Sequence, residues 1–301
     1  MSRPAPRRLE TALLTAATLV AFAFNSILTR LALGRGTIDA AGFTAVRLAA
    51  GALVLAVLAR EAAGSWRPLR PRGLVGPLTL FAYAAPFSFA YLRIGAATGA
   101  LALFGTVQLT MIGWDVAHGA RPAARTWLGI ILAMLGLSAL TLPAAGRPDP
   151  LGLLLMVVAG VAWAAYSLQG RRATDPLAAN ARAFLWSLPP ALLLAAVTLG
   201  PAAWSGGGLV LAATSGAVTS GLGYAVWYRA LQGLTATRAA IVQLGVPVIA
   251  ALSAVALLGE SLDLRLVSSG ALVIGGVALA LTARPGRSRA DAGRPVPGLE
   301  S

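Results

Sequence analysis

The sequence predicts an all-α integral membrane protein with ten transmembrane helices. First, 57% of the 301 residues are hydrophobic and only 11% are charged, whereas a soluble protein carries about 25% charged residues. Second, ten apolar runs of membrane-spanning length follow one another, separated by glycine, proline and arginine. Third, the arginines between these runs are distributed unequally between alternate segments.

The first apolar run, residues 9–33, follows Arg3, Arg7 and Arg8 in the manner of a signal peptide. It is too long for a cleaved apolar region, so we interpret it as a permanent span. The next runs lie at residues 40–59, 73–93, 96–116, 124–142, 150–170, 178–199, 208–229, 236–258 and 264–283. The tail, 284–301, is rich in proline, glycine and arginine, and we expect it to be disordered.

The placement of arginine predicts the orientation. With the N-terminus in the cytoplasm, eighteen of the 24 arginines lie in cytoplasmic segments, five lie in outside segments or at span edges, and Arg47 lies within a span. Because cytoplasmic loops carry an excess of basic residues, we expect both termini to be cytoplasmic. The expected location is the inner (plasma) membrane, which the chain crosses several times.

A nearly constant offset relates the two halves of the chain. Phe22, Ser26 and Arg30 recur 141 positions later as Trp163, Ser167 and Arg171, and three glycines recur with an offset of 140. The expected domains are therefore a five-helix repeat at 1–142, a linker at 143–149 and a second repeat at 150–283. Since five is odd, the second repeat enters the membrane from the opposite side, which makes an inverted repeat.

Composition excludes several classes of function. The net charge of +14 is compatible with nucleic-acid binding, but the arginines lie between apolar runs, so we expect no nucleic-acid partner. The chain has no cysteine and one histidine, His118, and its ten acidic residues are scattered. We therefore expect no metal, no cofactor and no enzymatic activity.

Short motifs stand in a fixed order along the spans. The first half has Phe22-Ala23-Phe24-Asn25-Ser26 and Arg47, and the second half has Tyr228-Arg229-Ala230-Leu231, Pro247 and Leu258-Gly259-Glu260. Together with glycine-rich fifth and tenth spans, they resemble the EamA-type family of the drug/metabolite transporter superfamily over about residues 10–283. The first half departs from the family pattern, with Phe22 in place of a common tryptophan and Gly119-Ala120 in place of Gly-Glu.

The resemblance implies export of metabolites, often amino acids, and the aromatic-rich spans are similar to those of the aromatic amino-acid exporters. It also implies alternating access around a site at the midplane. The expected partners are a small-molecule substrate and the lipid bilayer. The oligomeric state is open between a monomer and a dimer joined through small residues of the spans.

Polar and aromatic residues deep within spans are the candidates for substrate binding, because such residues are costly in lipid unless they face a cavity or another helix. The alternative for the polar ones is helix–helix hydrogen bonding, and for aromatic ones near span ends it is anchoring at the interface. We expect spans 1, 3, 4, 6, 8 and 9 to line one cavity. The candidates are Asn25, Arg47, Tyr83, Phe104, Gln108, Trp163, Tyr166, Tyr224 and Gln243.

Arg47 can hold a substrate carboxylate or serve a structural role, and both readings stay open. Asp115 and Glu260 lie at span ends, where we expect structural or solvated charges. Proline interrupts three spans, and the resulting kinks are static bends or gating hinges. The candidate hinges are Pro86, Pro189 and Pro247.

The energy source follows from the acidic residues. Proton coupling usually uses a carboxylate buried at the midplane, and no span carries one there. We therefore expect a facilitated carrier for a neutral or zwitterionic substrate. The alternatives are a proton-coupled exporter of drugs or other metabolites, and a receptor or scaffold that transports nothing.

Overall fold

The computed structural model describes residues 8–63, 73–94, 96–142, 149–198, 204–258 and 263–283. These residues form helices and turns, without a β-strand among them. Residues 143–148 of the predicted linker, Glu260 and the tail 284–301 lie outside the described part of the chain. The predicted all-α fold class is confirmed.

Within the described residues, ten helical segments cross the molecule. Nine of the described segments are long and apolar enough to span a membrane, and the tenth, α3, is shorter but apolar. The elements are α1 (Arg8–Gly34), α2 (Ala40–Ala63), α3 (Val75–Ala90), α4 (Ala96–Ala117), α5 (Ala124–Thr141), α6 (Pro150–Arg171), α7 (Pro176–Thr198), α8 (Gly206–Thr214), η2 (Ser215–Leu222), α9 (Gly223–Leu231), α10 (Ala236–Gln243), α11 (Gly245–Leu258) and α12 (Leu264–Thr282). One span consists of α8, η2 and α9, and another of α10 and α11.

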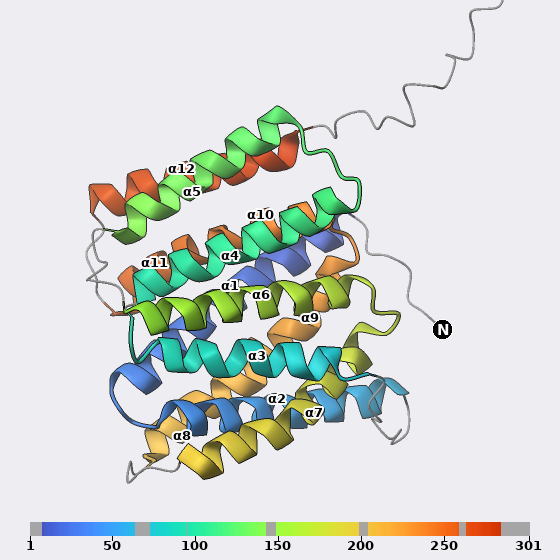
Figure 1. The fold of residues 1–301 in the computed structure, drawn as a ribbon, viewed down its shortest axis with the longest axis vertical. Coiled ribbons are helices and arrows are strands. Elements are labelled where there is room, and N and C mark those ends of the chain that lie inside the picture. The colour runs from blue at the N-terminus through green and yellow to red at the C-terminus, as the bar shows by residue number, and fades with distance from the viewer. Residues whose placement is uncertain are drawn as a thin grey trace, which may run out of the picture.

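The spans run roughly side by side, and successive spans alternate in direction (Figure 1). We call the end where α1 begins and α12 ends the termini face, on the right of Figure 1, and the opposite end the far face. α3 lies in the middle of the stack, against α6, α7 and α2. Its 16 residues span about 24 Å at 1.5 Å per residue, which is less than a bilayer core, but half of them are buried by these neighbours.

Contacts between the two halves follow a symmetric scheme. α5 packs on α12 and α2 on α7, which are equivalent spans of the two halves. The contact of α3 with α6 has its counterpart between α9 and α1, and that of α4 with α6 has its counterpart between α11 and α1. This is the pattern that an inverted repeat predicts.

The α5–α12 pair is joined by small residues. A Cβ added at Gly129 would lie 2.5 Å from the carbonyl oxygen of Gly276, and one added at Gly276 would lie 2.5 Å from the backbone nitrogen of Ala133. The two backbones therefore touch, as in the small-xxx-small packing of membrane helices. In Figure 1 this pair forms the uppermost layer of the stack.

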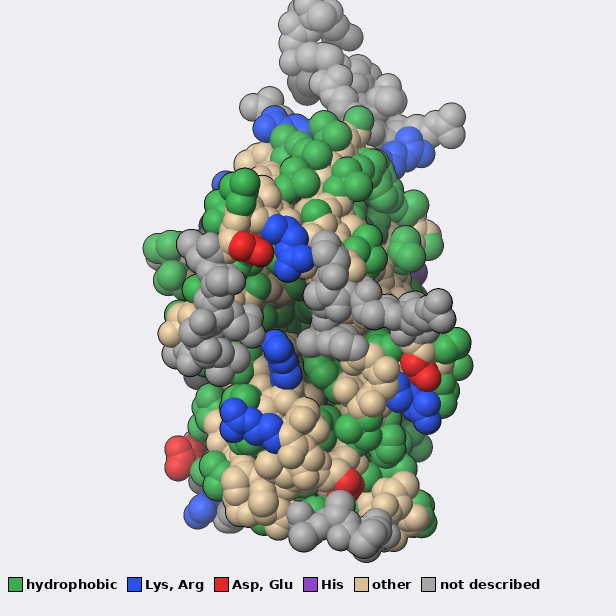
Figure 2. Space-filling view, turned by 90° about the vertical axis from the view of Figure 1, so that its left-hand side faces the viewer, with side chains coloured by type: hydrophobic (Ala, Val, Ile, Leu, Met, Phe, Trp, Pro, Cys, Tyr) green, Lys and Arg blue, Asp and Glu red, His purple; other side chains and the backbone are tan. Residues whose placement is uncertain are grey.

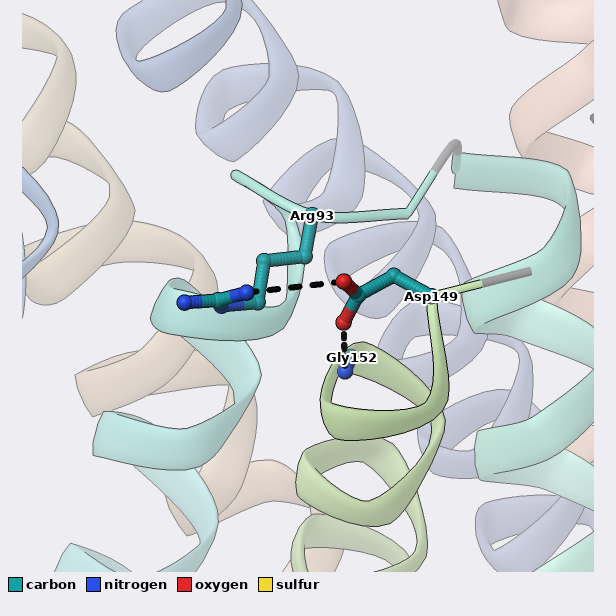
Figure 3. Close-up of polar contacts among 3 residues, drawn as sticks. All are labelled: Arg93, Asp149 and Gly152. Carbon is teal, nitrogen blue, oxygen red and sulfur yellow. Dashed lines mark hydrogen bonds and ion pairs between the residues drawn. The ribbon is translucent and has the colours of Figure 1, made fainter. Parts of the chain in front are cut away.

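The two halves are also joined at the far face by a charged contact (Figure 3). Asp149 caps α6, since its Oδ1 accepts a hydrogen bond from the backbone nitrogen of Gly152 at 2.7 Å. Its Oδ2 lies 3.5 Å from a guanidinium nitrogen of Arg93, which follows α3. Both side chains are exposed to solvent, so the ion pair contributes little stability by itself.

The arginine distribution leads to a topology prediction. A reporter that is active only in the periplasm, fused at Arg284, should give no signal, while the same reporter inserted between Gly34 and Ala40 should give a strong one. The reason is the excess of arginine on the termini face. The reverse pattern of signals would contradict cytoplasmic termini.

Candidate functional site

A large vestibule opens on the far face. Figure 2 shows this face, with a hollow near its middle and basic side chains beside it. The vestibule has a volume of about 840 Å³, which is within the usual range for small-molecule sites. Its charged lining residues are Arg30, Arg35, Arg265 and Asp263, so basic groups outnumber acidic ones in the described lining.

A small central cavity lies deeper than the vestibule, and the two share Ser26, Phe104 and Val246 in their linings. Its volume of about 30 Å³ is enough for a water molecule but far too small for an amino acid. The lining residues come from spans 1, 3, 4, 6, 8 and 9, as predicted, and they are Phe22, Asn25, Ser26, Tyr83, Phe87, Leu103, Phe104, Trp163, Tyr224, Gln243 and Val246.

Four aromatic side chains, Phe22, Tyr83, Trp163 and Tyr224, form what we call the aromatic box. Trp163 is at its centre, with ring centroids 4.8 Å from Tyr83, 4.8 Å from Tyr224 and 5.2 Å from Phe22. The indole nitrogen of Trp163 donates a hydrogen bond to Oε1 of Gln243 at 2.6 Å. Edge-on and tilted contacts of this kind favour a fixed arrangement of rings, so the box presents a preformed apolar wall to the cavity.

Tyr166 supports this wall from behind and is not part of the described cavity lining. Its assignment to substrate binding stays a prediction. It is fully buried, its hydroxyl donates to Oδ1 of Asn180, and Asn180 in turn donates to the backbone carbonyl of Tyr224 at 2.8 Å. The hydroxyl of Tyr228 donates to the backbone carbonyl of Tyr166 at 3.0 Å. These bonds fix α6, α7 and α9 to one another, so Tyr166 positions the box.

Asn25 lines the cavity as predicted, but its side-chain oxygen is already engaged. The hydroxyl of Ser215 donates to this oxygen at 2.8 Å, and the hydroxyl of Thr219 lies 3.2 Å from it. Ser215 and Thr219 belong to η2, a π-helical segment, and such segments occur frequently at functional sites. Asn25 therefore ties α1 to the irregular part of the eighth span.

Arg47 is the only fully buried arginine among the described residues. Its Nε donates to the hydroxyl of Ser220 at 2.8 Å, and its Nη2 donates to the hydroxyl of Tyr224 at 2.5 Å. The guanidinium carbon lies 5.5 Å from the ring centroid of Tyr83 and 5.8 Å from that of Phe87. Arg47 is not part of the described cavity lining, but it contacts three residues that are, Tyr83, Phe87 and Tyr224. Both interpretations of Arg47 therefore stay open.

Gln108 also lies outside both cavities. It donates a hydrogen bond to the backbone of the ninth span, at the break between α10 and α11. Between α10 and α11 the backbone nitrogen of Leu244 donates to the carbonyl of Ile241, three residues back. The carbonyl of Ala240 accepts instead from Nε2 of Gln108 at 2.6 Å. This is the helix–helix hydrogen-bonding role that was the alternative for Gln108.

The three candidate hinge prolines differ in their surroundings. α3 continues across Pro86 and α7 across Pro189, so the helices are not interrupted there. Pro247 follows the irregularity at Leu244 closely and lines the vestibule. Because proline lacks a backbone N–H, the carbonyl of Gln243 is without its usual helical donor. The helix α11 (Gly245–Leu258) nevertheless continues across Pro247, so the hinge role of all three prolines stays a prediction.

Hydrogen bonds join neighbouring spans at the termini face, and those of Asp115 connect the two halves. Oδ2 of Asp115 accepts from the backbone nitrogen of Thr237 at 2.8 Å and from its hydroxyl at 2.7 Å, which is a structural role at the start of α10. Nε of Arg171 donates to the carbonyl of Leu234 at 3.0 Å. The described vestibule thus opens towards the far face, while these bonds hold the spans together at the termini face.

Several residues of the site were not among the candidates from sequence. Ser26, Phe87, Leu103 and Val246 line the cavity, and Ser215, Thr219 and Ser220 bond to its polar residues. The recurrence of Ser26 as Ser167 was a signal for the first of these. The sequence contains no comparable signal for the small polar residues of η2, because their bonding partners lie far away in α1 and α2.

Comparison with known proteins identifies related sequences and a related fold. The profile of the EamA-like transporter family matches residues 150–282. An uncharacterized protein of Pseudomonas aeruginosa is 48% identical over 286 residues, which cover 93% of this chain and 97% of the relative. A protein of known crystal structure has the same fold, with a TM-score of 0.77 and 18% identity over 91% of this chain and 98% of its own.

Proposed function

We infer the function from one premise, which is that this chain belongs to the EamA-like transporter family and is a multi-pass membrane protein. We propose that it exports amino acids with apolar or aromatic side chains across the inner membrane. The proposed mechanism is alternating access, in which the two halves rock around the central cavity.

The aromatic box carries this proposal. Four large rings surround a cavity at the middle of the spans, and amide and hydroxyl groups of Asn25, Ser26 and Gln243 share its lining. A wall of this kind suits a ligand with an apolar or ring-bearing part and a few polar atoms. With cytoplasmic termini, the open vestibule corresponds to an outward-facing state.

The central cavity must enlarge before it admits such a ligand, because about 30 Å³ is far below the volume of about 300 Å³ of a small-molecule site. The vestibule supplies the route to the cavity. We therefore interpret the structure as a state in which the outer route is open and the site itself is collapsed.

We further propose that transport is facilitated rather than proton-coupled. No described Asp, Glu or His lines the central cavity, and Asp115 is held by Thr237 near the termini face. A proton-coupled exporter of drugs or other metabolites is the second candidate. The tyrosines that line the cavity carry hydroxyl groups, and a proton can pass along such groups.

Efflux from liposomes tests this function. Liposomes that contain the purified protein and are preloaded with radiolabelled phenylalanine should release it faster than protein-free liposomes, with equal pH on both sides. Release that occurs only with an imposed pH gradient would contradict facilitated export and favour the second candidate. Absence of release under both conditions would contradict amino-acid export.

A further inference from the structure

We propose that Arg47 forms a carboxylate-binding subsite of the central cavity. The substrate is then recognised by its carboxylate, and its amino group makes no specific contact. This inference rests on the proposed function, because it concerns the substrate of the same cavity. It defines the ligand class as carboxylic acids with an apolar or aromatic body, amino acids being one kind.

The first step is the incomplete bonding of Arg47. The residue is 1% exposed, yet its Nη1 has no hydrogen-bond partner among the described residues. Its other two nitrogens bond to the neutral hydroxyls of Ser220 and Tyr224. A guanidinium stays protonated in proteins, and a buried charge without a counter-charge is costly. A substrate carboxylate would supply both the missing acceptor and the missing negative charge.

The second step is the position of Arg47 relative to the cavity. Three aromatic side chains, Tyr83, Phe87 and Tyr224, contact the guanidinium and also line the cavity. Rotation of Tyr83 or Tyr224 would therefore enlarge the collapsed cavity towards the guanidinium. A guanidinium and a carboxylate match in geometry and form paired hydrogen bonds.

The third step concerns the amino group. The two side-chain amide oxygens of the lining are engaged, Oδ1 of Asn25 by Ser215 and Oε1 of Gln243 by Trp163. No described acidic residue lines the central cavity. The unpartnered Oε1 of Gln108 belongs to a residue that lines neither cavity. An ammonium group in the cavity would therefore meet the faces of aromatic rings, but no anionic side chain and no free amide oxygen of the described lining.

The vestibule is consistent with this preference. Its described lining contains three basic residues, Arg30, Arg35 and Arg265, and one acidic residue, Asp263. A cleft lined mainly by one sign of charge raises the local concentration of ions of the opposite sign. Carboxylates are therefore favoured at the entrance of the route to Arg47.

A series of analogues on the unchanged protein tests the subsite. In liposomes that exchange radiolabelled phenylalanine, phenyllactate and phenylpropionate should compete within about tenfold of phenylalanine itself. Phenethylamine, which has the ring and the ammonium but no carboxylate, should compete roughly ten- to a hundredfold less well, as expected for the loss of a charge-assisted hydrogen bond. Competition by phenethylamine as strong as that by phenylalanine would overturn the subsite.

The same series separates this inference from the proposed function. If phenylalanine is exchanged but the amine competes best, amino-acid export stands and the subsite is wrong. If phenylalanine is not exchanged, binding of phenylpropionate and phenethylamine is measured by tryptophan fluorescence of the solubilised protein. Preference for the acid would then support the subsite although the proposed function failed, and preference for the amine would overturn both.

Variants distinguish recognition from a structural role. Arg47→Gln should abolish the preference for phenylpropionate over its neutral amide, and Arg47→Lys should retain part of it. Arg125→Gln is the matched control, because Arg125 is exposed at the start of α5 and its loss removes the same charge. If Arg47→Gln weakens the acid and the neutral amide equally, Arg47 only holds Tyr224 in place and the proposal is wrong.

Discussion

Replacement of Trp163 by alanine should lower phenylalanine efflux about tenfold or more per reconstituted molecule. Its indole contacts Phe22, Tyr83 and Tyr224 with centroid distances of 4.8–5.2 Å, and it supplies the hydrogen bond to Oε1 of Gln243. The variant removes the centre of the aromatic box and leaves a buried oxygen without its donor. The measurement is efflux from liposomes, normalised to the folded protein recovered.

Two further variants separate the contributions. Trp163→Phe keeps a ring but loses the indole N–H, so it should retain more activity than Trp163→Ala. Trp127→Ala is the matched control, because Trp127 is 43% exposed and lies on α5, away from the box. Equal losses of efflux in Trp127→Ala and Trp163→Ala would show that the box has no special part in transport.

Gly216→Ala should destabilise the protein by about 1–3 kcal/mol, the usual cost of overpacking. An added Cβ at Gly216 would overlap the carbonyl oxygen of Arg47 and lie 2.8 Å from its Cα. Since all these atoms belong to backbone, the eighth span must move away from α2. That movement would also stretch the bonds from Arg47 to Ser220 and Tyr224. Thermal unfolding of the purified protein in detergent measures the change.

The matched control is the same substitution at Gly113. A Cβ at this helical position meets nothing within 4 Å, so alanine should stabilise by about 0.5–1 kcal/mol through its higher helix propensity. The two substitutions should thus shift the unfolding temperature in opposite directions. A Gly216→Ala protein as stable as the unchanged one would show that α2 and η2 are not packed as closely as described.

The spans could be predicted from sequence because their signal is local. An apolar run such as 150–170 carries its own length and hydrophobicity, and α6 (Pro150–Arg171) follows it to within one residue. The π-helical turn of η2 could not be predicted in this way. Its residues Ser215 and Ser220 bond to Asn25 and Arg47, which lie far away in the sequence.

Part of the cavity lining could be predicted for a related reason. Depth within a span can be read from sequence, and Trp163, Tyr224 and Gln243 indeed lie on the cavity. The direction of a side chain around its helix, and the level at which the cavity closes, depend on neighbouring spans. Gln108 lies one turn beyond Phe104 towards the termini face, and there it meets the carbonyl of Ala240 instead of open space.

Substrate protection of a single cysteine tests most directly the central claim that the vestibule and cavity form the transport route. The chain has no cysteine, so Ser26→Cys introduces a unique thiol at a residue that lines both spaces. Gly206→Cys is the control, exposed on the same face with nothing near its Cβ. We expect a membrane-impermeant thiol reagent to label both variants from the far face, and phenylalanine to slow labelling of Ser26→Cys alone. If a transported substrate leaves the labelling of Ser26→Cys unchanged, or if that thiol reacts only from the termini face, the route described here is contradicted.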